Sequence, residues 1–138
     1  MQQMKINPDF MPKDNKLLPD EGAEQATLFS WAKMRSSMYP ELRLMFHIPN
    51  GGRRGKAEAG KFKMEGVKAG VPDIFLPAPR GEFHGLFIEM KKLRGGKVSA
   101  EQRAWIQDLR GQGYAAEVCC GWQEAAETIS KYLDIPCN

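Results

Sequence analysis

Three charged side chains in the middle of the chain have the types and spacing needed for metal-dependent phosphodiester hydrolysis. Asp73 follows Pro72, Glu89 comes sixteen positions later, and Lys91 stands two residues beyond Glu89. Two neighbouring carboxylates, with room for waters and a phosphate oxygen, are ligands that Mg²⁺ or Mn²⁺ prefers. A nearby ammonium can orient the attacking water and stabilise the developing negative charge. An alternative interpretation is a turn aspartate followed by a surface strand that carries a Glu/Lys pair.

Two short strands are expected to bring these side chains together. Residues 86–91 read LFIEMK, and because side chains alternate along a strand, Glu89 and Lys91 point to the same face. Phe87 shares that face, which predicts a wet cleft lined by the charges. Asp73 opens a second apolar run, closed by Pro77, and enters it from a glycine turn. If the strands are neighbours, the two carboxylates can meet, and an exposed Met90 carbonyl could add a third metal ligand.

Five segments, in order, resemble the motifs of the VRR-NUC (virus-type replication-repair nuclease) family. They are EGAEQ (21–25), HIPNGG (47–52), GVPD (70–73), LFIEMK (86–91) and SAEQRAW (99–105), and the resemblance covers about residues 21–133. The family belongs to the PD-(D/E)xK nucleases. The resemblance implies Mg²⁺- or Mn²⁺-dependent DNA cleavage, often at branched structures such as four-way junctions or flaps, with 5'-phosphate products. The family's distribution also suggests a phage or prophage origin and a role in replication or repair.

The same resemblance implies a role for each matching residue. Asp73 and Glu89 resemble the metal-binding acids, and Lys91 resembles the catalytic lysine. A glutamate of the first helix resembles an additional acid, either Glu21 or Glu24. Glu21 is preferred, because it lies four residues before Gln25 and so shares a helical face with it.

The elements expected around the site alternate between helix and strand. A helix is expected over residues 21–38, capped by Asp20, and strands over 42–48, 73–76 and 86–91. A short helix is expected within 56–65, a helix after Ser99 up to Gly111, a strand over 114–120 and a final helix over 122–133. The main order α-β-β-β-α-β-α predicts an α/β fold, with a mixed sheet of about four strands flanked by helices. It is similar to the restriction-endonuclease-like core.

Length and composition favour one globular domain. The chain has 138 residues, 42% of them hydrophobic, and no apolar run that could span a membrane. Residues 1–20 are expected to form an irregular arm and residues 21–138 the nuclease-like domain. With no apolar signal sequence and three cysteines that lack metal-binding spacing, the chain is expected inside a bacterium or in the cytoplasm of a phage-infected host.

Basic residues cluster on both sides of the predicted site, although the net charge is only +3. A loop and short helix around residues 50–68 and a run after Lys91 are expected to bind the DNA backbone, with a solvated helix face as the alternative for the first cluster. The glycine-rich loop lacks the residues of a nucleotide-binding P-loop, so no nucleotide cofactor is expected. Next to this loop, His47 could touch substrate. The predicted DNA-binding residues are Asn50, Arg53, Arg54, Lys56 and Lys92.

Ser99 and Gln102 have the spacing of a helix capping box. Gln102 also matches the family pattern, so it could point to the metal site instead, with Gln25 as a second supporting residue. A different class of function is a non-catalytic module that recognises DNA structure, although the intact Asp73, Glu89 and Lys91 argue against it. A sequence-specific restriction enzyme lacks a visible recognition domain. By family analogy, a homodimer would present two active sites to the two strands of branched DNA.

Overall fold

The computed structural model describes residues 18–49 and 56–138. The arm predicted over residues 1–20 lies almost wholly outside the described residues, and so do Asn50, Arg53, Arg54 and the side chain of Lys56. Within the described part of the chain, no helix is both long enough and apolar enough to cross a membrane.

Four strands form one mixed sheet in the order β1-β2-β3-β4. The strands are β1 (Phe46–His47), β2 (Ile74–Leu76), β3 (Leu86–Lys91) and β4 (Ala115–Cys120). β2 pairs antiparallel with both β1 and β3, whereas β3 and β4 are parallel, in a register that sets Glu89 opposite Val118. The mixed four-stranded sheet predicted from the sequence is confirmed.

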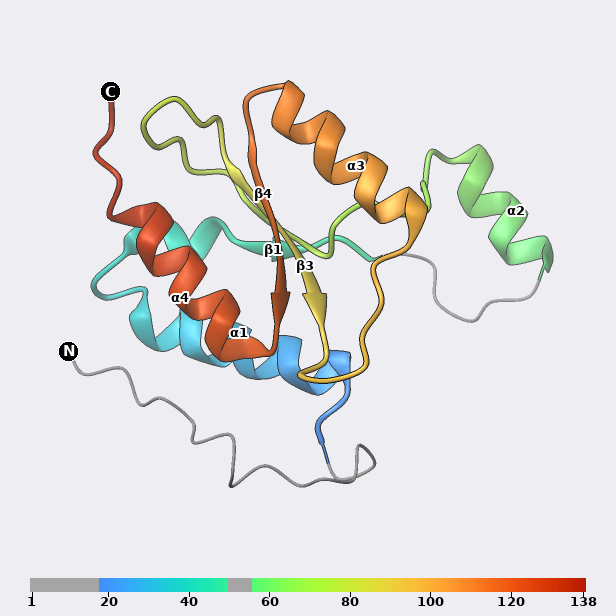
Figure 1. Cartoon of the computed structure of the whole chain (residues 1–138), viewed down its shortest axis with the longest axis horizontal. Helices are drawn as coiled ribbons and strands as arrows, with labels where there is room; N and C mark the ends of the chain where they lie inside the picture. The colour runs from blue at the N-terminus through green and yellow to red at the C-terminus, as the bar shows by residue number, and fades with distance from the viewer. Residues whose placement is uncertain (1–17, 50–55) are drawn as a thin grey trace.

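Helices cover both faces of this sheet (Figure 1). The described helices are α1 (Glu21–Arg35), the 3-10 helix η3 (Pro40–Leu44), α2 (Lys56–Met64), α3 (Ala100–Gly111) and α4 (Trp122–Leu133). α2 stands apart from the rest of the fold in Figure 1. The predicted bounds of α4 match the structure, and those of α3 agree within one residue. α1 ends three residues earlier than predicted. The chain leaves the helix in a turn in which the amides of Met38 and Tyr39 both donate to the carbonyl of Arg35.

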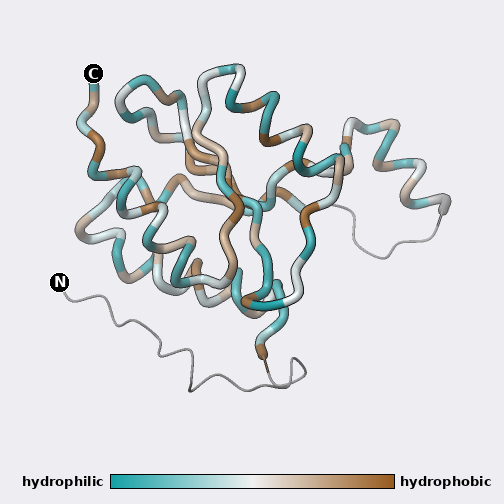
Figure 2. Tube along the Cα trace, viewed as in Figure 1, coloured by the Kyte–Doolittle hydropathy of each residue, from teal (hydrophilic) through white to brown (hydrophobic). Residues whose placement is uncertain are grey.

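The main hydrophobic core lies between one face of the sheet and the pair α1 and α4. Ile88 and Met90 of β3 are buried there with Leu28 of α1 and Ile129 of α4. The tube in Figure 2 shows hydrophobic residues gathered along the central strands. Because side chains alternate along a strand, Glu89 points to the opposite face. α3 covers that face, since Gln102 of α3 reaches Glu89.

The strand predicted over residues 42–48 is mostly wrong. Residues 40–44 form the 3-10 helix η3, and only Phe46 and His47 pair with β2. Leu42 and Met45 are buried, three residues apart, whereas Leu44 is 56% exposed. Burial with a period of three is typical of a 3-10 turn. The alternation of hydrophobic residues along this segment therefore does not correspond to alternating burial.

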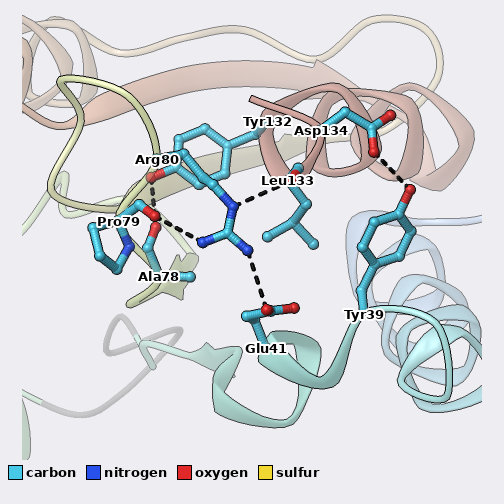
Figure 3. Close-up of polar contacts among 8 residues, drawn as sticks. All are labelled: Tyr39, Glu41, Ala78, Pro79, Arg80, Tyr132, Leu133 and Asp134. Carbon is cyan, nitrogen blue, oxygen red and sulfur yellow. Dashed lines mark hydrogen bonds and ion pairs between the residues drawn. The ribbon is translucent and has the colours of Figure 1, made fainter. Parts of the chain in front are cut away.

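A polar clasp joins the loop after β2 to the end of α4 and to η3 (Figure 3). The buried Arg80 donates to the carbonyls of Leu133, at 3.2 Å, and Pro79, at 2.7 Å. Its guanidinium also pairs with Glu41 of η3 at 3.2 Å. The Tyr132 hydroxyl donates to the carbonyl of Ala78 at 2.6 Å. These contacts fix the C-terminal end of α4 against the loop after β2 and link that loop to η3.

Candidate active site

Asp73 is held against β3 by a main-chain contact. Its Oδ2 accepts a hydrogen bond from the amide of Met90 at 2.8 Å. The contact follows from the antiparallel register, which sets Ile74 opposite Ile88 and so places the preceding Asp73 next to the end of β3. The predicted meeting of the two strands therefore occurs.

Glu89 is the most deeply buried acid of the site, with 2% of its surface exposed. Its Oε1 accepts a hydrogen bond from Gln102 Nε2 at 2.7 Å and lies 3.4 Å from Lys91 Nζ. Its Oε2 is also buried but has no hydrogen-bond donor among the described residues. A buried carboxylate oxygen without a partner is costly, so it marks a place where another group is expected to bind.

The surroundings of Glu89 favour its protonated, neutral form. Burial, followed by the negative charge of Asp73, raises the pKa of Glu89 from 4.5 to about 7, although the charge of Lys91 opposes the shift. Two neighbouring carboxylates disfavour each other's ionised form. One buried ammonium does not compensate both acids. Strongly shifted pKa values of this kind concentrate at functional sites.

Lys91 is buried as well, with 6% of its surface exposed. A Cβ added to Gly96 would lie 3.0 Å from Lys91 Cβ and 3.3 Å from its Cδ, so the loop after β3 packs along the lysine stem. The prediction that Glu89 and Lys91 line a wet cleft is thus wrong, because this loop and Gln102 cover them. Met90 is buried too, so its carbonyl is not exposed as predicted.

The turn that leads into Asp73 is fixed by α3 and by β1. The indole of Trp105 donates to the carbonyl of Ala69 at 3.0 Å. Gly70 has a φ of 90°, and a Cβ there would lie 2.8 Å from the main chain of Glu101, so only glycine fits this approach. The imidazole Nδ1 of His47 lies 2.8 Å from the carbonyl of Asp73. His47 therefore anchors the main chain of the predicted metal ligand, while its ring remains exposed.

Comparison with known proteins identifies this arrangement. The sequence matches the family model of the VRR-NUC domain over residues 20–123. The chain belongs to the VRR-NUC family. A solved structure of a VRR_NUC domain protein is 32% identical, with a TM-score of 0.76 over 86% of this chain and 92% of that chain. Comparison with curated proteins gives no significant match. The fold is therefore restriction-endonuclease-like, and the family is of the nuclease type.

Two glutamates of α1 were candidates for the additional acid of the VRR-NUC motif. Glu21, preferred from the sequence, is exposed on the first turn, and Gln25 is half-buried. Glu24 is instead buried, with 5% of its surface exposed, and aligns with Leu28 and Ala32 along the buried stripe of the helix. This spacing of four residues was the sequence signal for a buried Glu24. Its carboxylate accepts from the amide of Trp122 at 2.7 Å.

The basic residues of this VRR-NUC domain divide between described and undescribed segments. Lys92 is half-buried at the end of β3. Lys61, on α2, is exposed and pairs only loosely with Glu65, at 4.0 Å. The remaining described members of the two basic clusters are exposed, namely Lys63, Lys68, Arg94 and Lys97. Contact of these residues with DNA remains a prediction.

The acids of the site suit a divalent cation but do not form a complete cage. In residues 18–49 and 56–138, no three acidic, histidine or cysteine side chains form a group able to hold a metal. Asp73 and Glu89 provide two carboxylates, and Glu89 has an oxygen without a partner. Hard oxygen ligands in an incomplete site suit Mg²⁺ and Mn²⁺, which keep several waters. The donor set therefore fits a metal that also binds water and substrate.

Proposed function

We propose that the protein is a metal-dependent DNA endonuclease that hydrolyses phosphodiester bonds. The observation that carries the proposal is the buried Glu89, whose Oε2 lacks a partner and whose pKa is raised to about 7 by burial and by the neighbouring Asp73. A carboxylate pair of this kind is destabilised when it is alone and stabilised by a cation. Membership of a nuclease-type family supports the same chemistry.

Each residue of the site has a distinct proposed role. Asp73 and Glu89 would hold Mg²⁺ or Mn²⁺, and waters would complete the coordination. When bound there, the ion would neutralise charge on the scissile phosphate and lower the pKa of a coordinated water. Lys91 would orient the attacking water and stabilise the negative charge that develops. Gln102 fixes the carboxylate of Glu89 through the 2.7 Å hydrogen bond to Oε1, which leaves Oε2 for the metal.

The test compares wild type with Lys91→Ala on labelled four-way junction, flap and duplex DNA, each with Mg²⁺, Mn²⁺ or EDTA. Cuts that require metal and disappear in the variant are expected, with only a modest loss of DNA binding. Preference for a branched substrate would establish structure selectivity. Tight, metal-independent binding by both proteins without any cutting would contradict the proposal and favour a non-catalytic recognition module.

We further propose a homodimer that places two sites on branched DNA. Large hydrophobic side chains are exposed on α1 and on the segment after it, namely Met34, Met38, Leu44 and Phe46. Such side chains are available to an interface between two copies. Light scattering is expected to give twice the monomer mass of 15.5 kDa. A monomer with full cleavage activity at the same concentration would contradict the dimer.

A further inference from the structure

Glu24 is a buried charge that the carboxylate pair does not use. It points from α1 into the fold with Leu28 and Ala32, whereas Asp73 is the acid whose charge raises the pKa of Glu89. No third acidic side chain of the described residues joins this pair to form a metal-binding group. Since a buried carboxylate needs compensation, the partner that Glu24 does have indicates its role.

The partner of Glu24 is the start of α4, 98 residues away in the sequence. Its Oε2 accepts a hydrogen bond from the amide of Trp122 at 2.7 Å. Trp122 is the first residue of α4, and the N-cap residue, Gly121, has no side chain to cap the helix. The first amides of a helix have no partner within it, and the positive end of the helix dipole favours an anion there. Glu24 therefore replaces the missing N-cap side chain from another helix.

The N-cap residue Gly121, directly before α4, also holds the end of β3. The amide of Gly121 donates to the carbonyl of Lys91 at 2.9 Å. Gly121 has a φ of 85°, and a Cβ there would lie 2.8 Å from Leu93 Cδ1 and 3.6 Å from Glu24 Oε2. Only glycine allows the main chain to adopt this φ and to lie so close to both Leu93 and Glu24. Two hydrogen bonds, from the adjacent amides of Trp122 and Gly121, thus connect Glu24 to the main chain of Lys91.

We propose that Glu24 is a positioning residue of the nuclease site, acting as an inter-element cap that sets the place of Lys91 without binding the metal. The proposal rests on the proposed nuclease function. Lys91 Nζ lies 3.4 Å from Glu89 Oε1, so a shift of the Lys91 main chain moves the ammonium relative to the carboxylates. Small displacements of a catalytic group are costly in rate.

This role requires a hydrogen-bond acceptor at position 24, whereas an acid that binds Mg²⁺ or Mn²⁺ contributes mainly through its negative charge. Glutamine keeps an acceptor oxygen at nearly the same place and lacks the charge. Glu24→Gln should therefore keep the cap and lose only the attraction between charge and helix dipole, whereas Glu24→Ala should lose both. The two substitutions separate positioning from metal binding.

The experiment measures kcat, KM and metal dependence for Glu24→Gln, Glu24→Ala and Glu89→Gln, at a temperature where all are folded. We expect Glu24→Gln to retain kcat within about threefold and Glu24→Ala to lose about tenfold or more in kcat with little change in KM. Glu89→Gln should abolish cleavage. Thr27→Ala, an exposed substitution on the same helix, serves as the control. Amide hydrogen exchange should show Trp122 exchanging at least about tenfold faster only in Glu24→Ala.

Four results would overturn the proposal. Loss of cleavage in Glu24→Gln equal to that in Glu89→Gln would make Glu24 a metal ligand and leave the nuclease function intact. Cleavage by Glu24→Ala at the wild-type rate, or unchanged exchange of the Trp122 amide, would show that the cap does not position Lys91. Absence of cleavage by wild type would refute the nuclease function itself, and the positioning role with it.

Discussion

The two oxygens of Glu89 have different environments, so one carboxylate can be held in place and still offer an oxygen to a cation. Oε1 is engaged by Gln102 and lies near Lys91, whereas the buried Oε2 has no partner. A fully satisfied carboxylate would be more stable and less able to bind a cation. The local cost at Glu89 is therefore consistent with a residue selected for binding and not for stability.

The raised pKa of Glu89 predicts a dependence of stability on pH without metal. The folded state holds the proton more tightly than the unfolded state, because the pKa rises from 4.5 to about 7. The associated stability is fully present below pH 4.5 and is lost as the pH rises through 7. In EDTA at pH 8, Glu89→Gln should be more stable than wild type by about 1–3 kcal/mol.

Urea denaturation of both proteins at pH 4.5, 6 and 8 measures this effect. The advantage of the variant should shrink towards pH 4.5, where the glutamate is protonated in the folded state and about half protonated in the unfolded state. Mg²⁺ at pH 8 should stabilise wild type and not the variant. A stability difference that stays constant with pH would contradict the assigned environment of Glu89.

A substitution at Gly96 tests whether cleavage depends on the present position of the Lys91 side chain. An added methyl group at Gly96 would lie 3.0 Å from Lys91 Cβ, so the lysine stem must move by a few tenths of an ångström. We expect Gly96→Ala to lower kcat about threefold to tenfold and to leave stability within about 0.5 kcal/mol. Gly111→Ala is the matched control, because nothing lies within 4 Å of a Cβ there. Equal kcat in the two variants would show that the packing is not important.

At the scale of elements, α3 assembles the site from its first turn. Gln102 accepts from the amide of Ser99 through Oε1, at 2.9 Å, and donates through Nε2 to Glu89. The capping and metal-site interpretations of Gln102 are thus compatible, because its amide oxygen caps the helix and its amide nitrogen binds Glu89. Glu101 of the same turn packs on Gly70, and Trp105 of the next turn holds Ala69. The helix start therefore positions both acids.

The double use of Gln102 gives a prediction with a built-in control. Gln102→Glu keeps an acceptor for the Ser99 amide but loses the donor to Glu89 and adds a third negative charge. Cleavage should fall about tenfold to a hundredfold, while the capping box persists. Ser99→Ala should do the reverse, with a loss of about 1 kcal/mol in stability and near-normal kcat. Unchanged cleavage by Gln102→Glu would reduce Gln102 to a helix cap.

The elements predicted from the sequence succeed where local patterns and tertiary environment agree. The strand over residues 86–91 and the helix over 122–133 were predicted with their observed bounds. The prediction for segment 42–48 failed because the core buries Leu42 together with Met45, whereas a strand would have placed Leu42 with Leu44 and Met45 on the opposite face. At the edge of the sheet only one neighbouring strand is available, so a short pairing such as that of Phe46 and His47 gives a weak signal.

At the scale of the whole molecule, the acids of the site were accessible to sequence reasoning but their supports were not. Asp73, Glu89 and Lys91 lie in short motifs, and the pairing of β2 with β3 brings them together. The contact of Glu24 with Trp122 joins residues 98 positions apart. No local pattern encodes such a contact, because it depends on how α1 and α4 pack together on the sheet.

The clasp around Arg80 is the corresponding long-range support at the opposite end of α4. Its guanidinium joins the carbonyls of Leu133 and Pro79 to the carboxylate of Glu41, so one side chain connects three elements. The Arg80 side chain is 10% exposed. Hydrogen bonds to charged groups contribute more than neutral ones, and a buried carbonyl that loses its donor is costly. The stability of the last turn of α4 is thus expected to depend on Arg80.

Arg80→Met should destabilise the protein by about 2–3 kcal/mol, because methionine fills much of the space but donates no hydrogen bond. Urea denaturation provides the measurement. Lys131→Met is the matched control: it removes the ion pair of Lys131 with Glu127, whose side chains are 74% and 40% exposed, and should cost at most about 0.5 kcal/mol. Hydrogen exchange of Arg80→Met should accelerate first in the last turn of α4. Similar losses in both variants would mean that burial of the clasp adds no stability.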